Sequence, residues 1–243
     1  MKQNSQGNTD NPRILIVGGV AGGASCATRA RRLSEKANII IFERGPFVSF
    51  ANCGLPYHVG NVIPNEADLL VTTPELFRTR FNIDVRVQND VLLIDRENKE
   101  VEVRNLVTGE TCREGYDALV LSPGAMPVRP PVPGIDLPGI FTLRTIPDSR
   151  EIRNWIDGKQ VKRAIVVGGG FIGLEMAENL TKRGISVGII EMLPQVMPVF
   201  DPEMIVSVHD HLVEKGVSLH LGDAVAGFEP GNNGNGITVR TAS

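Results

Sequence analysis

The sequence predicts an α/β fold in which one strand–turn–helix–strand plan occurs twice in tandem. Each copy has a short apolar run, a glycine-rich turn, a helical stretch and a second apolar run that ends in a glutamate. The first copy begins at residue 13 and ends at Glu43, and the second begins at residue 164 and ends at Glu191. Apolar runs that alternate with helical patterns indicate parallel strands joined by crossover helices.

The composition is that of an ordinary soluble globular protein. The chain has 243 residues, enough for one large or two smaller domains, with 42% hydrophobic and 22% charged residues. A formal net charge of −3 argues against broad electrostatic binding of nucleic acid. No apolar run approaches the roughly 20 residues of a membrane helix. The polar residues 1–12 lack the apolar stretch of a signal peptide, so we expect a disordered tail and a cytoplasmic protein.

The second copy carries a full G-x-G-x-x-G motif at Gly168, Gly170 and Gly173. In such a motif the first glycine allows a tight turn, the second lets a pyrophosphate approach the backbone, and the third lets the helix pack on the strand. The helix N-terminus then offers free N–H groups to the phosphates. Glu191, 23 residues after Gly168, is placed to accept hydrogen bonds from ribose hydroxyls. A carboxylate there repels a 2′-phosphate, so NADH is favoured over NADPH.

The first copy has Gly18, Val20 and Gly23 in the three places, so a valine replaces the middle glycine. Alone this motif is weak. It is strengthened by Glu43, 25 residues after Gly18, and by residues 91–122, which predict an antiparallel meander and end in a strand at ALVL. Two such units in tandem suggest two different dinucleotides. The alternative is a pair of glycine-rich turns that bind no ligand.

The organisation along the chain follows from these copies. We expect a first domain over 13–127, a stiff proline-rich crossover over 128–140 and a second domain over 141–243. The chain ends in two strands of a second meander, and the strand that should close the second nucleotide fold is missing. We therefore expect the second domain to be incomplete and the chain to be the N-terminal part of a longer protein.

The three cysteines do not form a disulfide framework in a chain of this length. Cys26 and Cys112 are expected to be inert. His209 and His211 are two residues apart on a predicted helix and so point to different faces, and no metal site is predicted. Cys53 lies in SFANCGLPYHVG, and it is either a packed structural thiol or a nucleophile.

Taken together, these motifs resemble the two-dinucleotide disulfide oxidoreductases, which bind FAD first and NAD(P)H second. Within them the chain is most similar to the coenzyme A-disulfide reductase and NADH-dependent persulfide reductase group. The resemblance covers residues 13–243, and its VGGVAGG stretch accounts for the valine in the first turn. The motifs that carry it are VGGVAGGAS (17–25), SFANCGLPY (49–57), LSPGA (121–125), FTLR (141–144) and GGGFIGLE (168–175).

The resemblance implies two Rossmann-like domains, FAD-binding and then NAD-binding, each with a meander. Phe171 matches an aromatic residue that covers the flavin until nicotinamide displaces it. Glu175 matches an acid near the flavin, although an exposed helix glutamate is an equal alternative. The FAD positions are Gly18, Gly19, Val20, Ala21, Gly22, Gly23, Glu43, Arg44, Ser122, Pro123, Gly124 and Arg144. The cofactor-binding positions of the second copy are Gly168, Gly170, Phe171, Ile172, Gly173, Glu175 and Glu191, of which Gly168–Gly173 form the NAD turn.

In relatives with two redox thiols, the second lies five residues after the first. Here that place is His58, so the resemblance implies that Cys53 cycles through a bond to an exogenous thiol, a sulfane sulfur or oxygen. Such chemistry needs the thiolate. A buried structural cysteine is the alternative.

A substrate face is implied on the first helix. Ser25, Arg29 and Arg32 stand at i, i+4 and i+7 and so share one face. In coenzyme A-disulfide reductases the matching positions contact coenzyme A together with those of Ser49, Asn52 and Cys53, and guanidinium groups suit its phosphates. The alternative is a solvated arginine-rich face. A lysine of some relatives aligns with Phe81, which weakens the resemblance at that position.

The expected function is that of a FAD-dependent NAD(P)H oxidoreductase that reduces coenzyme A disulfide, persulfide or polysulfide through Cys53. One alternative is an NADH oxidase or peroxidase that cycles through a sulfenic acid. Such peroxidases carry a histidine inside the first turn, which is absent here. Another alternative is a non-catalytic nucleotide-binding fragment. We expect a small-molecule thiol or disulfide partner, no nucleic acid or membrane, and a homodimer only in the full-length parent.

Overall fold

The computed structural model describes residues 11–231 and 236–243, which form two compact units. The first unit runs to Ala51 and resumes at Leu70–Ala125, and the second contains Asn52–Leu69 and Met126–Ser243. This division differs from the predicted domain boundaries chiefly at residues 52–69, which pack with the second unit. All of the predicted tail except Asn11 and Pro12 lies outside the described residues.

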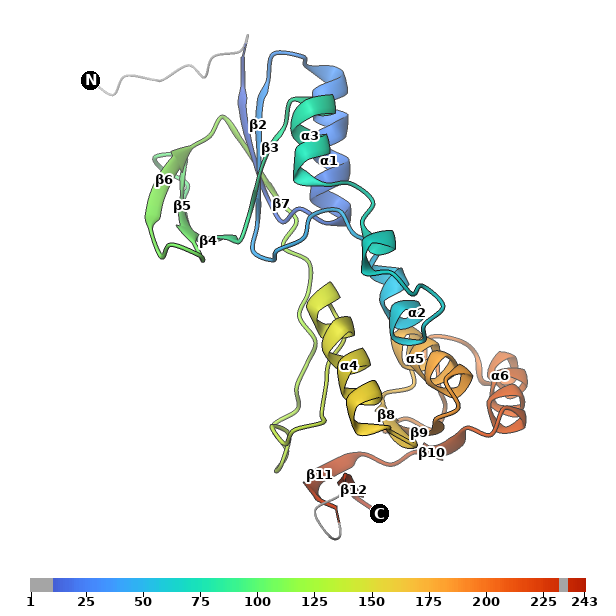
Figure 1. Cartoon of the computed structure of the whole chain (residues 1–243). Coiled ribbons are helices and arrows are strands. Elements are labelled where there is room, and N and C mark those ends of the chain that lie inside the picture. Colours follow the sequence, from blue (N-terminus) through green and yellow to red (C-terminus); the bar gives the residue numbers. More distant parts are fainter. Residues whose placement is uncertain (1–10, 232–235) are drawn as a thin grey trace. The chain divides into compact units, whose positions relative to one another are not determined.

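The first unit is built on a four-stranded parallel sheet in the order β3-β2-β1-β7 (Figure 1). In register, Val17 lies opposite both Phe42 and Leu121, so the carboxyl ends of the central strands meet at one edge. The strands are β1 (Arg13–Val17), β2 (Asn38–Glu43), β3 (Asp84–Val87) and β7 (Ala118–Leu121).

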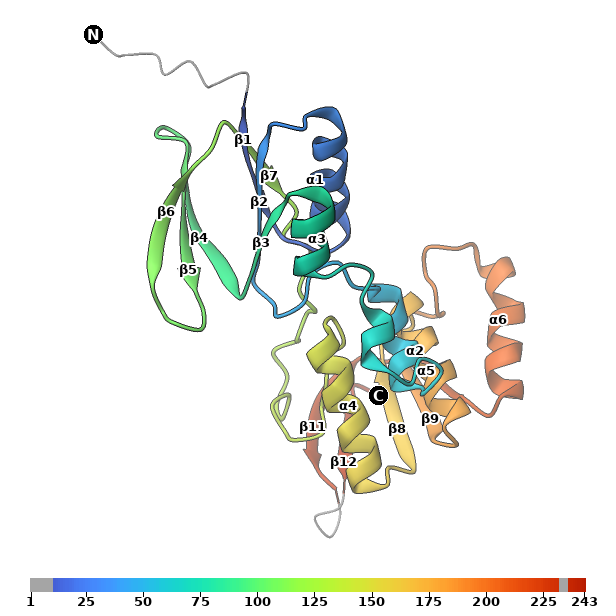
Figure 2. The same ribbon diagram turned by 45° about the horizontal axis from the view of Figure 1, so that its top comes forward.

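Two layers cover this sheet (Figure 2). One face packs on helices α1 (Ala21–Leu33) and α3 (Pro74–Phe81). The other face packs on the predicted meander, and side chains alternate between the two cores along β1, β2 and β7. The meander strands are β4 (Asn89–Asp95), β5 (Glu100–Asn105) and β6 (Thr111–Gly115). The last strand of the predicted meander is in fact two strands. The first of them, β6, stays in the meander, whereas β7 pairs in parallel with β1 of the main sheet.

Arg31 fastens the end of α1 to the end of α3. Its guanidinium donates hydrogen bonds of 2.6–3.1 Å to five backbone carbonyls, two of which belong to the end of α3 and the residue after it. The acceptors are Ser34, Glu35, Ala37, Phe81 and Asn82. One side chain thus satisfies carbonyls that helix ends leave without intrahelical partners.

The second unit repeats the plan on a three-stranded parallel sheet in the order β10-β9-β8. Helix α4 enters through a capping box in which Asp148 accepts from the N–H of Thr145 at 2.8 Å. The elements are α4 (Ile146–Lys159), β8 (Arg163–Val167), α5 (Phe171–Lys182), β9 (Ser186–Glu191), α6 (Pro202–Glu214), β10 (Ser218–Leu221) and the antiparallel pair β11 (Val225–Pro230) and β12 (Ile237–Thr241).

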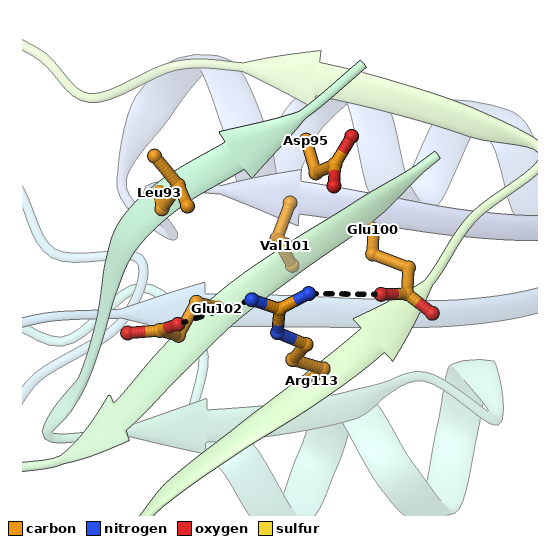
Figure 3. Close-up of a pocket in the computed structure, with 6 residues that line it drawn as sticks. All are labelled: Leu93, Asp95, Glu100, Val101, Glu102 and Arg113. Carbon is orange, nitrogen blue, oxygen red and sulfur yellow. Dashed lines mark ion pairs between the residues drawn. The ribbon is translucent and has the colours of Figure 1, made fainter. Parts of the chain in front are cut away.

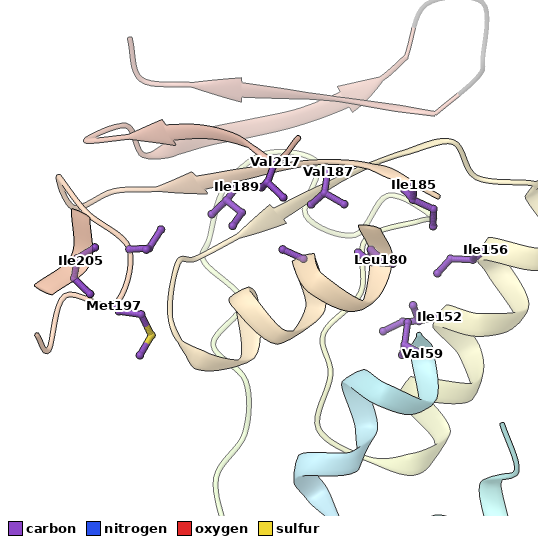
Figure 4. Packing of buried hydrophobic residues seen from close by; sticks show 12 residues of the cluster. Val59, Ile152, Ile156, Leu180, Ile185, Val187, Ile189, Met197, Ile205 and Val217 are labelled. Carbon is purple, nitrogen blue, oxygen red and sulfur yellow. The ribbon is translucent and has the colours of Figure 1, made fainter. Parts of the chain in front are cut away.

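A short segment from early in the chain completes this unit. It contains a 3-10 turn at Asn52–Gly54, helix α2 (Leu55–Val59) and a second 3-10 turn at Glu66–Leu69. Val59 of α2 lies in the same buried cluster as Ile152 and Ile156 of α4, Leu180 of α5, and Val187 and Ile189 of β9 (Figure 4).

The proline-rich crossover contains no helix between residues 126 and 140. Phe228 of β11 donates its N–H to the carbonyl of Pro133 at 2.8 Å, so the crossover is held against the β11–β12 pair. Among the helices of the described residues, none is long and apolar enough to cross a membrane.

Candidate functional site

Two glycine turns stand at equivalent places in the two units. Gly18 donates its N–H to the carbonyl of Phe42, and Gly168 donates to that of Ile190, both at 2.8 Å. Their φ angles are +91° and +100°, a backbone region that side chains with a Cβ rarely adopt. Each turn therefore begins with a residue that has to be glycine.

The third glycine of each motif is fixed by the turn itself. A Cβ on Gly23 would lie 1.8 Å from the carbonyl oxygen of Gly18, and one on Gly173 would lie 2.1 Å from that of Gly168. No side chain fits at such distances. The first turn of the helix therefore lies directly against the glycine turn, which sets where the free helix N–H groups point.

The second turn leaves its backbone open. Gly170 is the N-cap of α5, and a Cβ on Gly168 or Gly170 would meet no atom within 4 Å. A phosphate can approach this backbone and the uncapped start of the helix. The residues present thus fit the pyrophosphate of a dinucleotide.

In the first turn Val20 is the N-cap of α1, while Ala21 and Gly22 are exposed. A Cβ on Gly18 would lie 2.0 Å from the carbonyl oxygen of Ser122, and one on Gly22 would lie 3.4 Å from its Oγ. The structure therefore brings Ser122, together with the exposed Pro123 and Gly124 that follow β7, beside the first turn. These predicted positions lie together within the first unit.

The two acids brace the turns, a role that the sequence reasoning missed. Glu43 accepts from the N–H groups of Gly19 and Gly45, both at 2.7 Å. Glu191, which is 8% exposed, accepts from Gly169 at 2.7 Å and Leu193 at 2.9 Å. Each oxygen of these carboxylates thus holds one backbone N–H. Because a carboxylate oxygen has a further lone pair, both acids keep capacity for a ribose hydroxyl.

The loop after each acid also repeats. Ser49 donates its N–H to the carbonyl of Gly19 at 2.9 Å, and Met197 donates to that of Gly169 at 2.8 Å. The two residues have φ of 48° and 49°. The residue before each, Val48 or Val196, is buried against the same glycine. A sequence signal for this second repeat exists, since residues 43–48 and 191–196 both read E-x-x-P-x-V.

The remaining predicted cofactor residues vary in exposure. Arg44 pairs with Asp90 at 2.9 Å. Phe171 and Ile172 are exposed at the start of α5, and the Phe171 ring meets that of Phe200 edge to face at 6.3 Å. Arg144 and Glu175 are half-buried in the second unit. An exposed aromatic pair beside the second turn can receive a flat ring.

Cys53 is a free, exposed thiol on the 3-10 turn that leads into α2. Within the part of the chain that the structure describes, the Oδ1 atom of neighbouring Asn52 is buried and has no hydrogen-bond partner. The other two cysteines are also free: Cys26 is half-buried in α1, and Cys112 is exposed on β6.

His58 is 2% exposed and turns into the protein. Its Nδ1 lies 2.9 Å from the carbonyl oxygen of Ile63, which can only accept, so we assign the proton to Nδ1. Nη1 of Arg153 lies 2.9 Å from Nδ1 and 3.1 Å from Nε2, and with the proton on Nδ1 only Nε2 can accept from it. Burial lowers the pKa of His58 most, the hydrogen bond to Ile63 opposes this, and the charge of Arg153 lowers the pKa further. His58 is therefore a neutral imidazole at physiological pH.

The proposed substrate face is open. Ser25, Arg29 and Arg32 are all exposed on α1. Among the described residues, neither of these two arginines forms an ion pair. Ser49 is half-buried, and its carbonyl accepts from Val71 at 2.8 Å, so this residue also shapes the loop. The arginines are free to meet an anion.

A hollow on the meander offers no comparable site. Arg113 of β6 lies between Glu100 and Glu102 of β5, at 3.7 and 3.9 Å (Figure 3). These ion pairs lie on an exposed sheet surface, where each is worth little energy, and the hollow is only a shallow part of the meander surface.

Two βαβ units in tandem, each with an acid-braced glycine turn, define a protein with two dinucleotide-binding folds. The chain belongs to the pyridine nucleotide-disulphide oxidoreductase family, whose model matches residues 12–242. This is a family of oxidoreductases, and membership implies the use of a flavin and of NAD(P)H. Both the predicted fold class and the resemblance are confirmed.

Individual relatives point the same way. The chain is 39% identical to the coenzyme A disulfide reductase of Staphylococcus haemolyticus over 88% of this chain and 48% of that protein. It matches the crystal structure of reduced Bacillus anthracis CoADR-RHD with a TM-score of 0.91 and 49% identity, over 96% of this chain and 41% of that one. It also matches the NAD-dependent persulfide reductase of A. fulgidus with a TM-score of 0.88 and 34% identity, over 95% and 43%. The chain spans about half the length of the curated relatives it matches.

Proposed function

We propose that this chain is part of a FAD-dependent NAD(P)H oxidoreductase that reduces coenzyme A disulfide, a persulfide or a polysulfide through Cys53. One observation carries the proposal: Cys53 is exposed and free, while His58, where a second redox thiol would stand, is buried and hydrogen-bonded. The names of the coenzyme A disulfide and persulfide reductases that it resembles support the same substrate class.

The proposed chemistry at Cys53 is thiol–disulfide exchange. The Cys53 thiolate attacks one sulfur of coenzyme A disulfide, a new S–S bond forms to Cys53, and the other coenzyme A leaves as its thiolate. Two electrons and a proton then return the mixed disulfide to the Cys53 thiolate and free the second coenzyme A thiol. With no second thiol at residue 58, the chain itself cannot resolve the mixed disulfide.

Bound FAD and a nicotinamide nucleotide would supply those electrons, since hydride transfer is the chemistry of these two cofactors. The chain's own part is to bind and orient them. Gly18, Val20, Gly23, Glu43 and the Ser122–Gly124 loop would hold FAD, together with Arg44 and Arg144. Gly168, Gly170, Gly173 and Glu191 would hold the nicotinamide nucleotide, with Phe171, Ile172 and Glu175 along the start of α5.

The proposed nucleotide is NADH. The Glu191 carboxylate lies buried at the end of β9, where a ribose 2′-phosphate would meet a group that is already fixed by two backbone N–H groups. Repulsion between these two anions favours NADH over NADPH. The substrate is a small molecule and the compartment is cytoplasmic in this proposal, and a homodimer would involve the longer parent protein.

Arg29 and Arg32 are proposed to bind the phosphates of coenzyme A. Both are exposed, and Arg31 between them is fully engaged with backbone carbonyls. Ser25, Ser49 and Asn52 complete the set of proposed substrate residues. Guanidinium groups suit phosphates because they donate two parallel hydrogen bonds.

The test is an anaerobic titration of FAD-reconstituted protein with NADH and then with coenzyme A disulfide, followed through the flavin spectrum. Wild type, Cys53→Ser and Cys112→Ser are compared, the last as a control because Cys112 is also an exposed free thiol. We expect coenzyme A disulfide to reoxidise the flavin in wild type and Cys112→Ser but not in Cys53→Ser.

Other outcomes separate the alternatives. If only oxygen or peroxide reoxidises the flavin, an oxidase or peroxidase that uses a sulfenic acid replaces this proposal. If the chain takes up no FAD, it is a nucleotide-binding fragment, and the chemistry requires the remainder of the longer protein.

A further inference from the structure

We propose that His58, together with Arg153, is a positioning residue that fixes the Cys53 turn onto helices α4 and α5 of the second unit. The inference rests on the proposed function in one respect, namely that Cys53 is the reactive thiol. It gives His58 a role of its own in place of the missing second cysteine.

Helix α2 is too short to be stable by itself. This helix has only five residues, whereas isolated helices shorter than about 12 residues are marginal in water. It begins at Leu55, and its N-cap, Gly54, directly follows Cys53. The position of the Cys53 turn therefore depends on the tertiary contacts that hold α2.

Those contacts are a buried apolar face and a set of polar links. Leu55, Pro56 and Val59 are buried, and Val59 lies in the same cluster as Ile152 of α4 and Leu180 of α5. At the end of the helix, a Cβ on Gly60 would lie 2.3 Å from Oδ1 of the buried Asn179 of α5. The backbone of Gly60 therefore lies directly against the side chain of Asn179, with no room for a side chain at residue 60.

His58 is the centre of the polar links. Its Nδ1–H donates to Ile63, which closes the loop after α2, and its Nε2 accepts from Arg153 of α4. Nη1 of Arg153 also donates to the carbonyl of Pro64 at 2.9 Å. One arginine therefore ties both the helix and the loop after it to α4.

Two further arginines hold the same segment. Arg150 of α4 forms a two-pronged ion pair with Glu66, with contacts of 2.7 and 2.6 Å. Arg183, the C-cap of α5, donates to the carbonyl of Val59 at 2.9 Å and pairs with Asp157. The segment is thereby fastened at the C-terminal end of α2 and again at the second 3-10 turn.

The charges explain why a neutral ring suits this place. The charged groups near His58 are Arg150 and Arg153 from α4 and Glu66 from the second 3-10 turn, while Arg183 from α5 holds the next residue along the helix. An imidazolium would face these guanidinium groups, and protonated Nε2 could no longer accept from Arg153. A neutral His58 both donates and accepts.

The position of Cys53 is tested by two spin labels, one on Cys53 and one on Gly158→Cys, in a Cys26→Ser/Cys112→Ser background. Gly158 is exposed in α4, and a Cβ there meets nothing within 4 Å. We expect a narrow distance distribution in this background and a distribution at least twice as wide in His58→Ala and Arg153→Ala. His58→Asn should restore the narrow distribution, because its amide N–H can replace Nδ1–H toward Ile63.

Controls separate a local release from unfolding. A label pair at Gly158→Cys and Met204→Cys, in a background that also carries Cys53→Ser, should stay narrow in His58→Ala. Glu151→Ala, an exposed α4 residue, should leave the Cys53 pair narrow. A wide distribution in the starting background, or a narrow one in both His58→Ala and Arg153→Ala, overturns the inference. Because the labels need neither FAD nor coenzyme A, these results are independent of the titration that tests the proposed function.

Discussion

At the residue scale, Glu43 and Glu191 each have two tasks, of which the sequence pattern predicts only one. Their spacing after the glycines predicts contact with a ribose, while the structure shows each carboxylate holding the glycine turn and the following loop through N–H groups. The second task was not predictable from the motif, because it depends on where the chain returns after the acid.

The glycines of the second turn give a paired prediction. Gly173→Ala should lower the free energy of unfolding by about 1–3 kcal/mol, because its Cβ would collide with the carbonyl of Gly168. Gly170→Ala should leave stability nearly unchanged but weaken NADH binding, because its Cβ fills the open approach to the turn. Urea unfolding and NADH fluorescence titration measure the two effects. Equal loss of stability in both variants would contradict this assignment.

His58 gives a prediction on pH. Its pKa in the folded chain lies below the usual 6.5, so between these two values the unfolded chain binds a proton that the folded chain does not. The free energy of unfolding should therefore fall as the pH is lowered through 6.5 toward the folded value. His58→Asn, which cannot titrate, should lack this part of the slope. Urea midpoints at about pH 8 and about pH 5.5 measure the difference, and identical slopes would contradict it.

At the element scale, the sequence predicted both βαβ units and the first meander, because apolar period and glycine spacing are local signals. It did not separate β6 from β7, since the choice of partner strand depends on distant residues. It also did not predict that α2 packs on α4 and α5. That packing joins residues about ninety or more positions apart, such as His58 and Arg153.

Helix α1 offers a matched pair of neighbouring arginines. Arg31→Ala should lower the free energy of unfolding by roughly 2–3 kcal/mol, because it leaves the carbonyls at the ends of α1 and α3 without their donor. Arg32→Ala should change it by less than about 0.5 kcal/mol, since this side chain is exposed. In the proposed function Arg32→Ala instead slows the reaction with coenzyme A disulfide. Thermal unfolding of both variants, beside wild type, checks the contrast.

At the scale of the whole molecule, each unit has its own core and its own acid-braced turn. Glu43→Ala should therefore abolish FAD retention after reconstitution and leave NADH binding to the second turn within about twofold. Glu191→Ala should have the reverse effect. Flavin absorbance after gel filtration and NADH fluorescence give the two readouts, and loss of both ligands in either variant would show that the sites are not independent.

The assignment of residues 52–69 to the second unit affects how the protein can be divided for study. An expression fragment that begins at residue 126 would contain α4, α5 and the whole second sheet, yet it would lack Val59 and the rest of α2. The apolar side chains of α4 and α5 that α2 covers would then be open to solvent, and the fragment should be prone to self-association. A soluble version would need residues 52–69 joined to it by a linker, although they lie more than fifty positions upstream in the gene product.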